Sequence, residues 1–124
     1  MVLPTLLLVL FAIMELSRAW LTVNIVTTAT REGARMGSVT PPSTGTVDVF
    51  DPTDAEDRIR DILQAANLLT GATLSVECPP GGGSCVTGSE VMANVQVTFD
   101  TVLPFFLPML MDLNINQTTR MRYE

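Results

Sequence analysis

An apolar run opens the chain and sets the first prediction. Residues 1–26, MVLPTLLLVLFAIMELSRAWLTVNIV, contain only two charged side chains, Glu15 and Arg18. As an α-helix at 1.5 Å per residue, this stretch is roughly 39 Å long, which is enough to span a bilayer. It lacks the basic start and the small-residue cleavage site of an ordinary secretory signal. We therefore expect a helical membrane anchor that is retained in the mature protein.

The spacing of apolar residues predicts that the same helix continues through TTATREGARMGS and ends at Gly37. Gly33 and Ala34 are small enough for another backbone to approach closely. Because glycine in a helix costs about 1 kcal/mol relative to alanine, a packing requirement should offset that cost. We expect these two residues at an assembly interface. Four positions fall close to one helix face: Val23, Val26, Thr30 and Ala34.

A loop divides the chain into two units. Residues 39–50 are rich in Pro, Thr, Ser and Gly, a composition typical of an exposed connection. The sequence therefore predicts an N-terminal helix over residues 1–38, in the membrane or in a filament core, and an exported head over residues 39–124. With 124 residues in all, the chain is long enough for one globular domain besides the helix.

The head is expected to open with a second, amphipathic helix. Either Asp51 before a proline, or Thr53 with Glu56 three places on, can supply its N-cap. Gly71 is the predicted C-terminal stop. Apolar residues recur at intervals of three and four, which indicates one buried face. They are Ala55, Ile59, Ile62, Leu63 and Ala66.

Beyond Gly71 the hydrophobic period changes from helical to two. Residues 73–78 and 91–99 alternate between apolar and mostly polar side chains and predict a β-hairpin. The C-terminal stretch LNINQTTRMRYE alternates again and predicts a third antiparallel strand. The expected fold class is α+β, with a long apolar helix, one amphipathic helix and a three-stranded antiparallel sheet.

Two cysteines flank the predicted hairpin loop. Cys78 and Cys85 are separated by PPGGGS, residues that favour a tight loop. Two thiolates cannot complete a tetrahedral zinc site, and the spacer does not fit a redox C-x-x-C motif. We expect a structural disulfide, which would place the head outside the cytoplasm. The alternative is a pair of free, buried thiols in a reducing compartment.

The segment DTVLPFFLPMLMD, residues 100–112, fits no regular element because Pro104 and Pro108 interrupt it. Its large apolar residues, with Phe105 and Phe106 at the centre, leave two interpretations. The segment either covers the apolar face of the sheet or contacts a neighbouring subunit or lipid. We list both phenylalanines as candidate interface residues.

Charge and composition exclude several classes of function. Seven basic and thirteen acidic residues give a net charge of −6, with no lysine and no histidine. Binding to nucleic acid is disfavoured because the basic surface that phosphates require is missing. Catalytic triads and imidazole metal sites are excluded by the absence of histidine. We expect no enzymatic activity, no cofactor, no metal site and no small-molecule substrate.

Three segments carry a resemblance to a known family. VLPTLLLVLFAIMELSRAW, TREGARMGSV and the closing RMRYE resemble the TadE-like family, the pseudopilins of tight-adherence (Tad, or Flp) pili. The resemblance implies a pilin-like fold and a structural subunit, a pilin or minor pseudopilin, of an extracellular type IV-like filament for surface attachment. Its partners would be copies of itself in a helical homo-oligomer, or other pilins. It would reside in the cytoplasmic membrane before assembly. The alternative is a monomeric, single-pass anchored domain that acts as a binding or assembly factor.

The sequence departs from the family pattern at its start. Members usually carry a short basic leader and a glutamate at the fifth mature position, whereas Thr5 stands here and no leader precedes Met1. The chain therefore starts downstream of the natural one, or Met1 is the mature N-terminus. In the second case Glu15 is the only acid in the anchor. A buried carboxylate must be paired with Arg18, paired with a neighbour's amine, or held neutral. We expect Glu15 and Arg18 to govern assembly.

Overall fold

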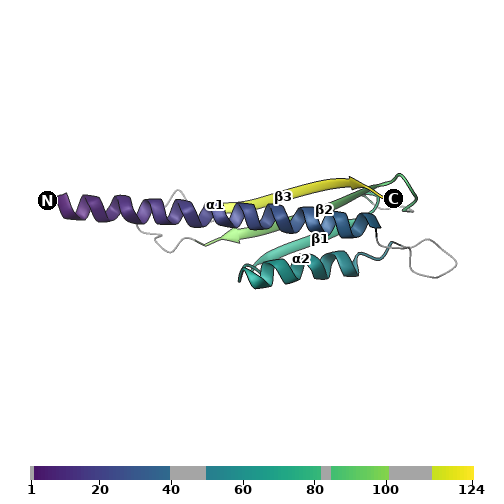
Figure 1. The fold of residues 1–124 in the computed structure, drawn as a ribbon, viewed down its shortest axis with the longest axis horizontal. Helices are drawn as coiled ribbons and strands as arrows, with labels where there is room; N and C mark the ends of the chain where they lie inside the picture. Colours follow the sequence, from purple (N-terminus) through teal and green to yellow (C-terminus); the bar gives the residue numbers. More distant parts are fainter. Residues whose placement is uncertain (1, 40–49, 82–84, 101–112) are drawn as a thin grey trace.

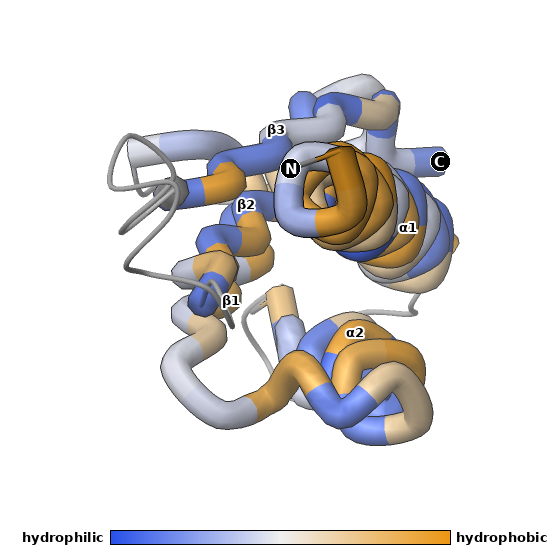
Figure 2. The backbone as a smooth tube through the Cα atoms, turned by 90° about the vertical axis from the view of Figure 1, so that its left-hand side faces the viewer, coloured by the Kyte–Doolittle hydropathy of each residue, from blue (hydrophilic) through white to orange (hydrophobic). Residues whose placement is uncertain are grey.

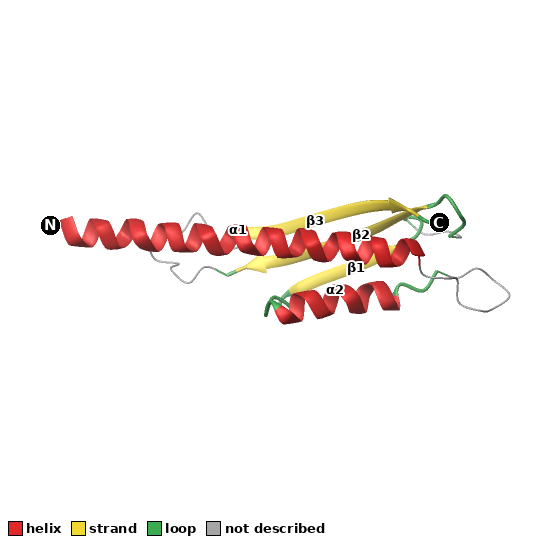
Figure 3. Ribbon diagram, in the orientation of Figure 1, coloured by secondary structure: helices red, strands yellow, loops and turns green. Residues whose placement is uncertain are grey.

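The computed structural model describes residues 2–39, 50–81, 85–100 and 113–124. In chain order the elements are α1 (Val2–Val39), α2 (Thr53–Ala65), β1 (Ala72–Glu77), β2 (Glu90–Phe99) and β3 (Leu113–Arg122). Figure 1 and Figure 3 show that α1 runs alongside the sheet for part of its length and projects far beyond it at the N-terminal end. The predicted α+β arrangement is confirmed.

The head is built from two layers. The three strands form one antiparallel sheet in the order β1-β2-β3, with Val76 opposite Ala93 and Ala93 opposite Thr119. Both helices lie on the same side of this sheet, α1 against β2 and β3 and α2 against β1 (Figure 2). The core between the layers follows from strict alternation along β2. Its buried side chains are Val91, Ala93, Val95, Val97 and Phe99.

The C-terminal half of α1 belongs to the core of the head. Val26, Ala29 and Ala34 are fully buried together with Ile59 and Leu63 of α2. Helix α1 ends at Val39, one residue beyond the boundary predicted after residue 38. The unit that packs together nevertheless includes much of this helix.

Gly37 does not end α1, contrary to the prediction. The helix continues to Val39, and Gly37 is buried within it. A Cβ at this position would lie 3.0 Å from Cγ1 of Val91 and 3.3 Å from Cγ1 of Val76. Glycine is therefore used here for a close approach of the helix to the sheet, not for a left-handed cap. Just beyond it, the carbonyl of Ser38 accepts a hydrogen bond from the N–H of Glu124 (3.1 Å).

Helix α2 begins where the sequence predicts. The carboxylate of Asp51 accepts hydrogen bonds from the hydroxyl of Thr53 and from its backbone N–H (3.0 Å). These two bonds, the hydroxyl contributing most, lower the pKa of Asp51 below its ordinary value. The N-cap residue itself is Pro52, which makes no side-chain cap hydrogen bond, so of the two candidates Asp51 contributes from one residue earlier, through its bonds to Thr53. A carboxylate here is also favoured by the positive end of the helix dipole.

The end of α2 differs from the prediction. The helix stops at Ala65, well before Gly71. Asn67 takes the left-handed conformation (φ 58°). Its N–H donates a hydrogen bond to the carbonyl of Gln64 (3.0 Å), and the N–H of Leu68 donates one to the carbonyl of Leu63 (2.8 Å). This is a Schellman motif, in which asparagine replaces the more common glycine. Gly71 (φ 80°) serves instead in the turn that leads into β1.

A disulfide joins Cys78 and Cys85, with 5.3 Å between their Cα atoms. Both residues are buried and belong to the core cluster at the end of β1. The predicted pairing is thus present, and the bond ties the exit of β1 to the segment that leads into β2.

We expect reduction of this disulfide to destabilise the head. For so short a loop, the chain-entropy relation gives about 2.5 kcal/mol. Intact-mass measurement should first show a gain of two hydrogens on reduction, and urea unfolding should then shift to lower denaturant concentration. The matched control is the Cys78→Ser, Cys85→Ser variant, whose unfolding should not respond to reductant. An unchanged mass in the native protein would show that the thiols are free.

Candidate functional site

The N-terminal half of α1 is the largest exposed apolar feature of the described residues. Large apolar side chains are exposed at most positions of the helix before Glu15, and much of this part of α1 has the colour of hydrophobic residues in Figure 2. An 18-residue window of α1 is long and apolar enough to cross a membrane, and only 11% of that window is buried. A core helix of a soluble protein would be mostly buried. The exposed members are Val2, Leu3, Leu6, Leu7, Leu8, Val9, Leu10, Phe11, Ile13 and Met14.

A charged pair lies where this exposed half meets the head. A guanidinium nitrogen of Arg18 lies 3.2 Å from a carboxylate oxygen of Glu15, one helical turn earlier. The Glu15 side chain is only 6% exposed, whereas that of Arg18 is 44% exposed. Arg18 also lies over the ring of Phe99, 5.6 Å from its centroid, at the end of β2. The guanidinium is therefore held by a carboxylate and by a cation–π contact. The sequence left three possibilities for Glu15, and the structure contains the first of them, a pair with Arg18 of the same chain.

Glu15 and Arg18 lie within the stretch whose sequence resembles a known family. Comparison with family models gives the same result. Residues 1–35 match the TadE-like protein family. The expected resemblance is confirmed over this stretch, the TadE-like segment, and it associates the chain with proteins of the Tad pilus. Comparisons with curated proteins and with solved structures find no match.

The end of the TadE-like segment packs inside the chain. Gly33 is buried in α1, and a Cβ there would overlap the side chain of Ile59 in α2. Ala34 is also fully buried. The sequence predicted a close approach of another backbone at these positions. The structure supplies that neighbour from the chain itself, so in this conformation neither residue offers a surface to a second subunit.

Phe105 and Phe106, the other predicted interface residues, lie outside the described residues, as does most of the segment 100–112. The choice between a cover for the sheet and a contact with a neighbour stays a prediction. The six candidate residues therefore separate into three groups. Glu15 and Arg18 form a pair, Gly33 and Ala34 are buried in the head, and the two phenylalanines are not placed.

Sequence reasoning missed the outer face of the sheet as a feature. This face carries a band of uncharged amide and hydroxyl side chains. Nδ2 of Asn94 in β2 donates to Oγ1 of Thr118 (2.9 Å) and to Oδ1 of Asn116 (3.2 Å), both in β3. The signal was present in the polar positions of the two alternating strands, which were used only to assign secondary structure. Such cross-strand bonds stabilise a solvated sheet face modestly.

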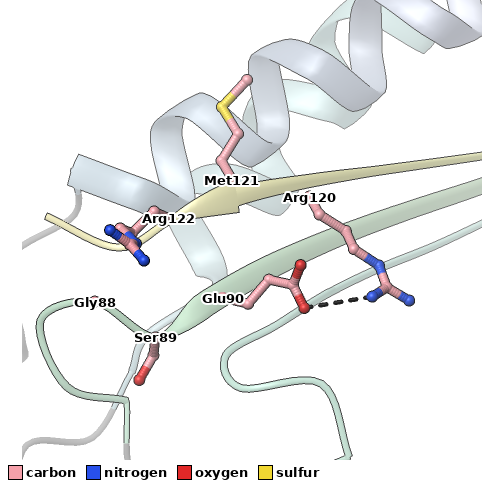
Figure 4. A pocket seen from close by; sticks show the side chains of 6 residues that line it. All are labelled: Gly88, Ser89, Glu90, Arg120, Met121 and Arg122. Carbon is pink, nitrogen blue, oxygen red and sulfur yellow. Dashed lines mark hydrogen bonds and ion pairs between the residues drawn. The ribbon is translucent and has the colours of Figure 1, made fainter.

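A shallow depression of about 240 Å³ lies where β2 begins and β3 ends (Figure 4). An ion pair between Arg120 and Glu90 (3.4 Å) crosses it, and both side chains are about half exposed. An exposed pair of this kind contributes between zero and about 1 kcal/mol. Among the residues described by the structure, no group of three or more Asp, Glu, Cys or His side chains could hold a metal ion. The lining residues are Gly88, Ser89, Glu90, Arg120, Met121 and Arg122.

Proposed function

We propose that this chain is a structural subunit, a pilin or minor pseudopilin, of a Tad pilus. The observation that carries the proposal is the exposed apolar half of α1, which projects from a folded head and lies in the TadE-like segment. Apolar surface of this extent on a helix requires a partner, either lipid or protein. A pilus subunit uses both in succession.

In this proposal α1 moves from one apolar environment to another. Before assembly it lies in the cytoplasmic membrane, where a helix satisfies all its own backbone hydrogen bonds. On assembly it enters a filament core beside the helices of other subunits, where packing replaces lipid contacts. The head, with its disulfide and its net negative charge, then lies on the outside of an extracellular filament for attachment to surfaces. The contact between successive subunits is heterologous, since such contacts generate open helical polymers.

The pair of Glu15 and Arg18 has a defined part in this transfer. A lone carboxylate in hydrocarbon or in a helical core is costly, whereas a paired carboxylate adds no net charge. The 3.2 Å contact within one helix travels with the helix, so the same compensation is available in the membrane and in the filament. Assembly therefore does not depend on the carboxylate finding a new partner at each step.

Cross-linking through a new cysteine in the exposed half tests the proposal. The described residues contain no free cysteine, so Leu10→Cys introduces a single thiol at an exposed site among them. In sheared cell-surface filaments, a bis-maleimide should link subunits into covalent dimers through this position because neighbouring helices pack in the core. The detergent-solubilised subunit should stay monomeric under the same treatment.

The control places the thiol at Gln64→Cys, on the exposed side of α2, where cross-links between core helices cannot form. Electron microscopy and immunoblotting of the sheared fraction should show filaments that contain the chain. If the chain stays in the membrane fraction and Leu10→Cys gives no cross-links, it is instead a monomeric anchored factor.

A further inference from the structure

The exposed surface of α1 changes character at one level of the helix. The continuous series of exposed apolar side chains ends at Trp20 and Leu21, which are 71% and 59% exposed, and the next ones in α1 are Met36 and Val39 near its C-terminal end. The next exposed positions are Asn24, Thr28 and Arg31. Within about one turn, the free face of the helix thus passes from apolar to polar.

Trp20 lies at this level and is the single tryptophan of the chain. It is strongly exposed although it is the largest apolar side chain. Indole rings concentrate at the boundary between hydrocarbon and headgroups, because one end of the ring is apolar and the N–H needs a polar partner. The ring therefore occupies the position where a bilayer boundary would favour it.

The length of the helix before Trp20 agrees with this placement. The 18-residue window suited to a membrane corresponds to about 27 Å of helix at 1.5 Å per residue. The stretch from Val2 to Ala19 has this length, and the hydrocarbon core of a bilayer is about 30 Å thick. The length of the apolar stretch of α1 before Trp20 thus matches the thickness of one bilayer without a large tilt.

The charged pair fits just below the same boundary. Glu15 is shielded by its own chain, and its pairing with Arg18 means that the two side chains add no net charge at this depth. The contact of Arg18 with Phe99 places the end of β2 at this level of α1. A boundary at Trp20 would therefore bring the end of the sheet to the membrane surface.

We propose that Trp20 lies at the headgroup boundary of a phospholipid bilayer, with α1 from Val2 to Ala19 in the hydrocarbon and the Phe99 end of the sheet resting on the membrane surface. This proposal rests on the membrane state in the proposed function and adds a depth and an orientation to it. Among the residues that the structure describes, α1 continues without a break from the proposed anchor to the level of Phe99.

Fluorescence of Trp20 tests the depth. The full chain is reconstituted in phosphatidylcholine and phosphatidylglycerol vesicles that carry brominated acyl chains, with bromine either near the headgroup or near the bilayer centre. We expect the ratio of shallow to deep quenching to exceed unity, and acrylamide in the water to quench only partly. Strongest quenching by the deep bromine would overturn the proposal, because Trp20 would then lie within the hydrocarbon. Absence of lipid quenching would also overturn it, whether acrylamide reaches the ring or a second protein copy shields it.

Two matched variants calibrate the depth measurement by placing the tryptophan at other levels of α1. Both contain Trp20→Phe, one with Phe11→Trp and the other with Thr28→Trp, all at exposed positions. The first moves the indole about 14 Å deeper and should be quenched most by the central bromine, and the second moves it about 12 Å outward and should respond to acrylamide alone. If the Phe11→Trp probe is not quenched by lipid, the helix is not inserted and the membrane state itself fails. If that probe is deep but Trp20 is not shallow, only the depth assignment fails.

Discussion

Replacing Gly33 by alanine is expected to destabilise the head in the native protein and to stabilise it when Ile59 is also shortened to alanine. The first effect arises because a Cβ at Gly33 would overlap the side chain of Ile59, both Cγ1 and Cδ1 being in its way. Overpacking of this kind costs about 1 to 3 kcal/mol, which outweighs the gain of about 1 kcal/mol from helix propensity. With Ile59→Ala the obstructing atoms are gone, and only the propensity gain remains.

The single change Ile59→Ala should itself cost about 2 to 5 kcal/mol, because Ile59 is fully buried between α1 and the rest of the core. Urea unfolding of the four proteins in detergent, followed by circular dichroism, gives the coupling between the two sites. If Ile59→Ala does not fold, Ile59→Val removes Cδ1 alone and should reduce the penalty of Gly33→Ala without reversing it.

Arg35→Ala is the matched control, since Arg35 is exposed on the same helix two residues further on. Its effect should lie within about 0.5 kcal/mol of zero. A Gly33→Ala variant as stable as the native protein would contradict the close contact between α1 and α2. It would also reopen Gly33 as a surface for a second subunit.

Arg18→Gln is expected to reduce filament number more than Glu15→Gln, and the double variant is expected to restore it. Removing Arg18 leaves a carboxylate that is only 6% exposed without the guanidinium that faces it. Breaking a buried pair from one side costs about 3 to 5 kcal/mol, and the half-exposed arginine places this case near the lower value. Removing Glu15 leaves a guanidinium that is 44% exposed in the isolated chain and keeps its contact with the Phe99 ring, so a smaller loss is expected.

Filament counts by electron microscopy, normalised to membrane levels by immunoblotting, provide the measurement. Glutamine keeps the approximate size and the hydrogen-bonding capacity of both side chains while it removes their charge. A double variant that stays defective would show that Glu15 serves a neighbouring subunit and not Arg18. Normal counts in both single variants would refute a part for the pair in assembly.

The strands and the start of α2 could be predicted because their signals are local. A period of two is visible along residues 91–99 whatever lies above the sheet, and the Asp51 side chain binds Thr53, two places away, at the start of α2. The disulfide could also be predicted, since its cysteines flank a short stretch of turn-forming residues. In each case the interactions that decide the structure span only a few residues.

The glycines could not be interpreted in the same way. A glycine near a helix end is compatible with a left-handed cap, a turn or a close contact, and only tertiary packing selects among them. Gly37 faces Val91 and lies within α1, whereas Gly71 enters a turn and leaves the cap of α2 to Asn67. For the same reason Gly33 suggested a neighbouring subunit, although its neighbour is Ile59 of the same chain. The sequence marks where space is needed but not what fills it.

The continuity of α1 gives the molecule a mechanical property. One uninterrupted helix of 38 residues runs from the exposed apolar half into the core of the head, so the two parts have no hinge between them. When the N-terminal half of the helix tilts, the head therefore tilts with it by the same angle. From Trp20 to Val39 the helix extends about 28 Å, and a tilt of about 20°, usual for helices in bilayers, would sweep its far end sideways by about 10 Å. A force that moves the N-terminal half out of the membrane would likewise move the head at the same time, because the two parts are joined by continuous helix and not by a linker that must first be stretched.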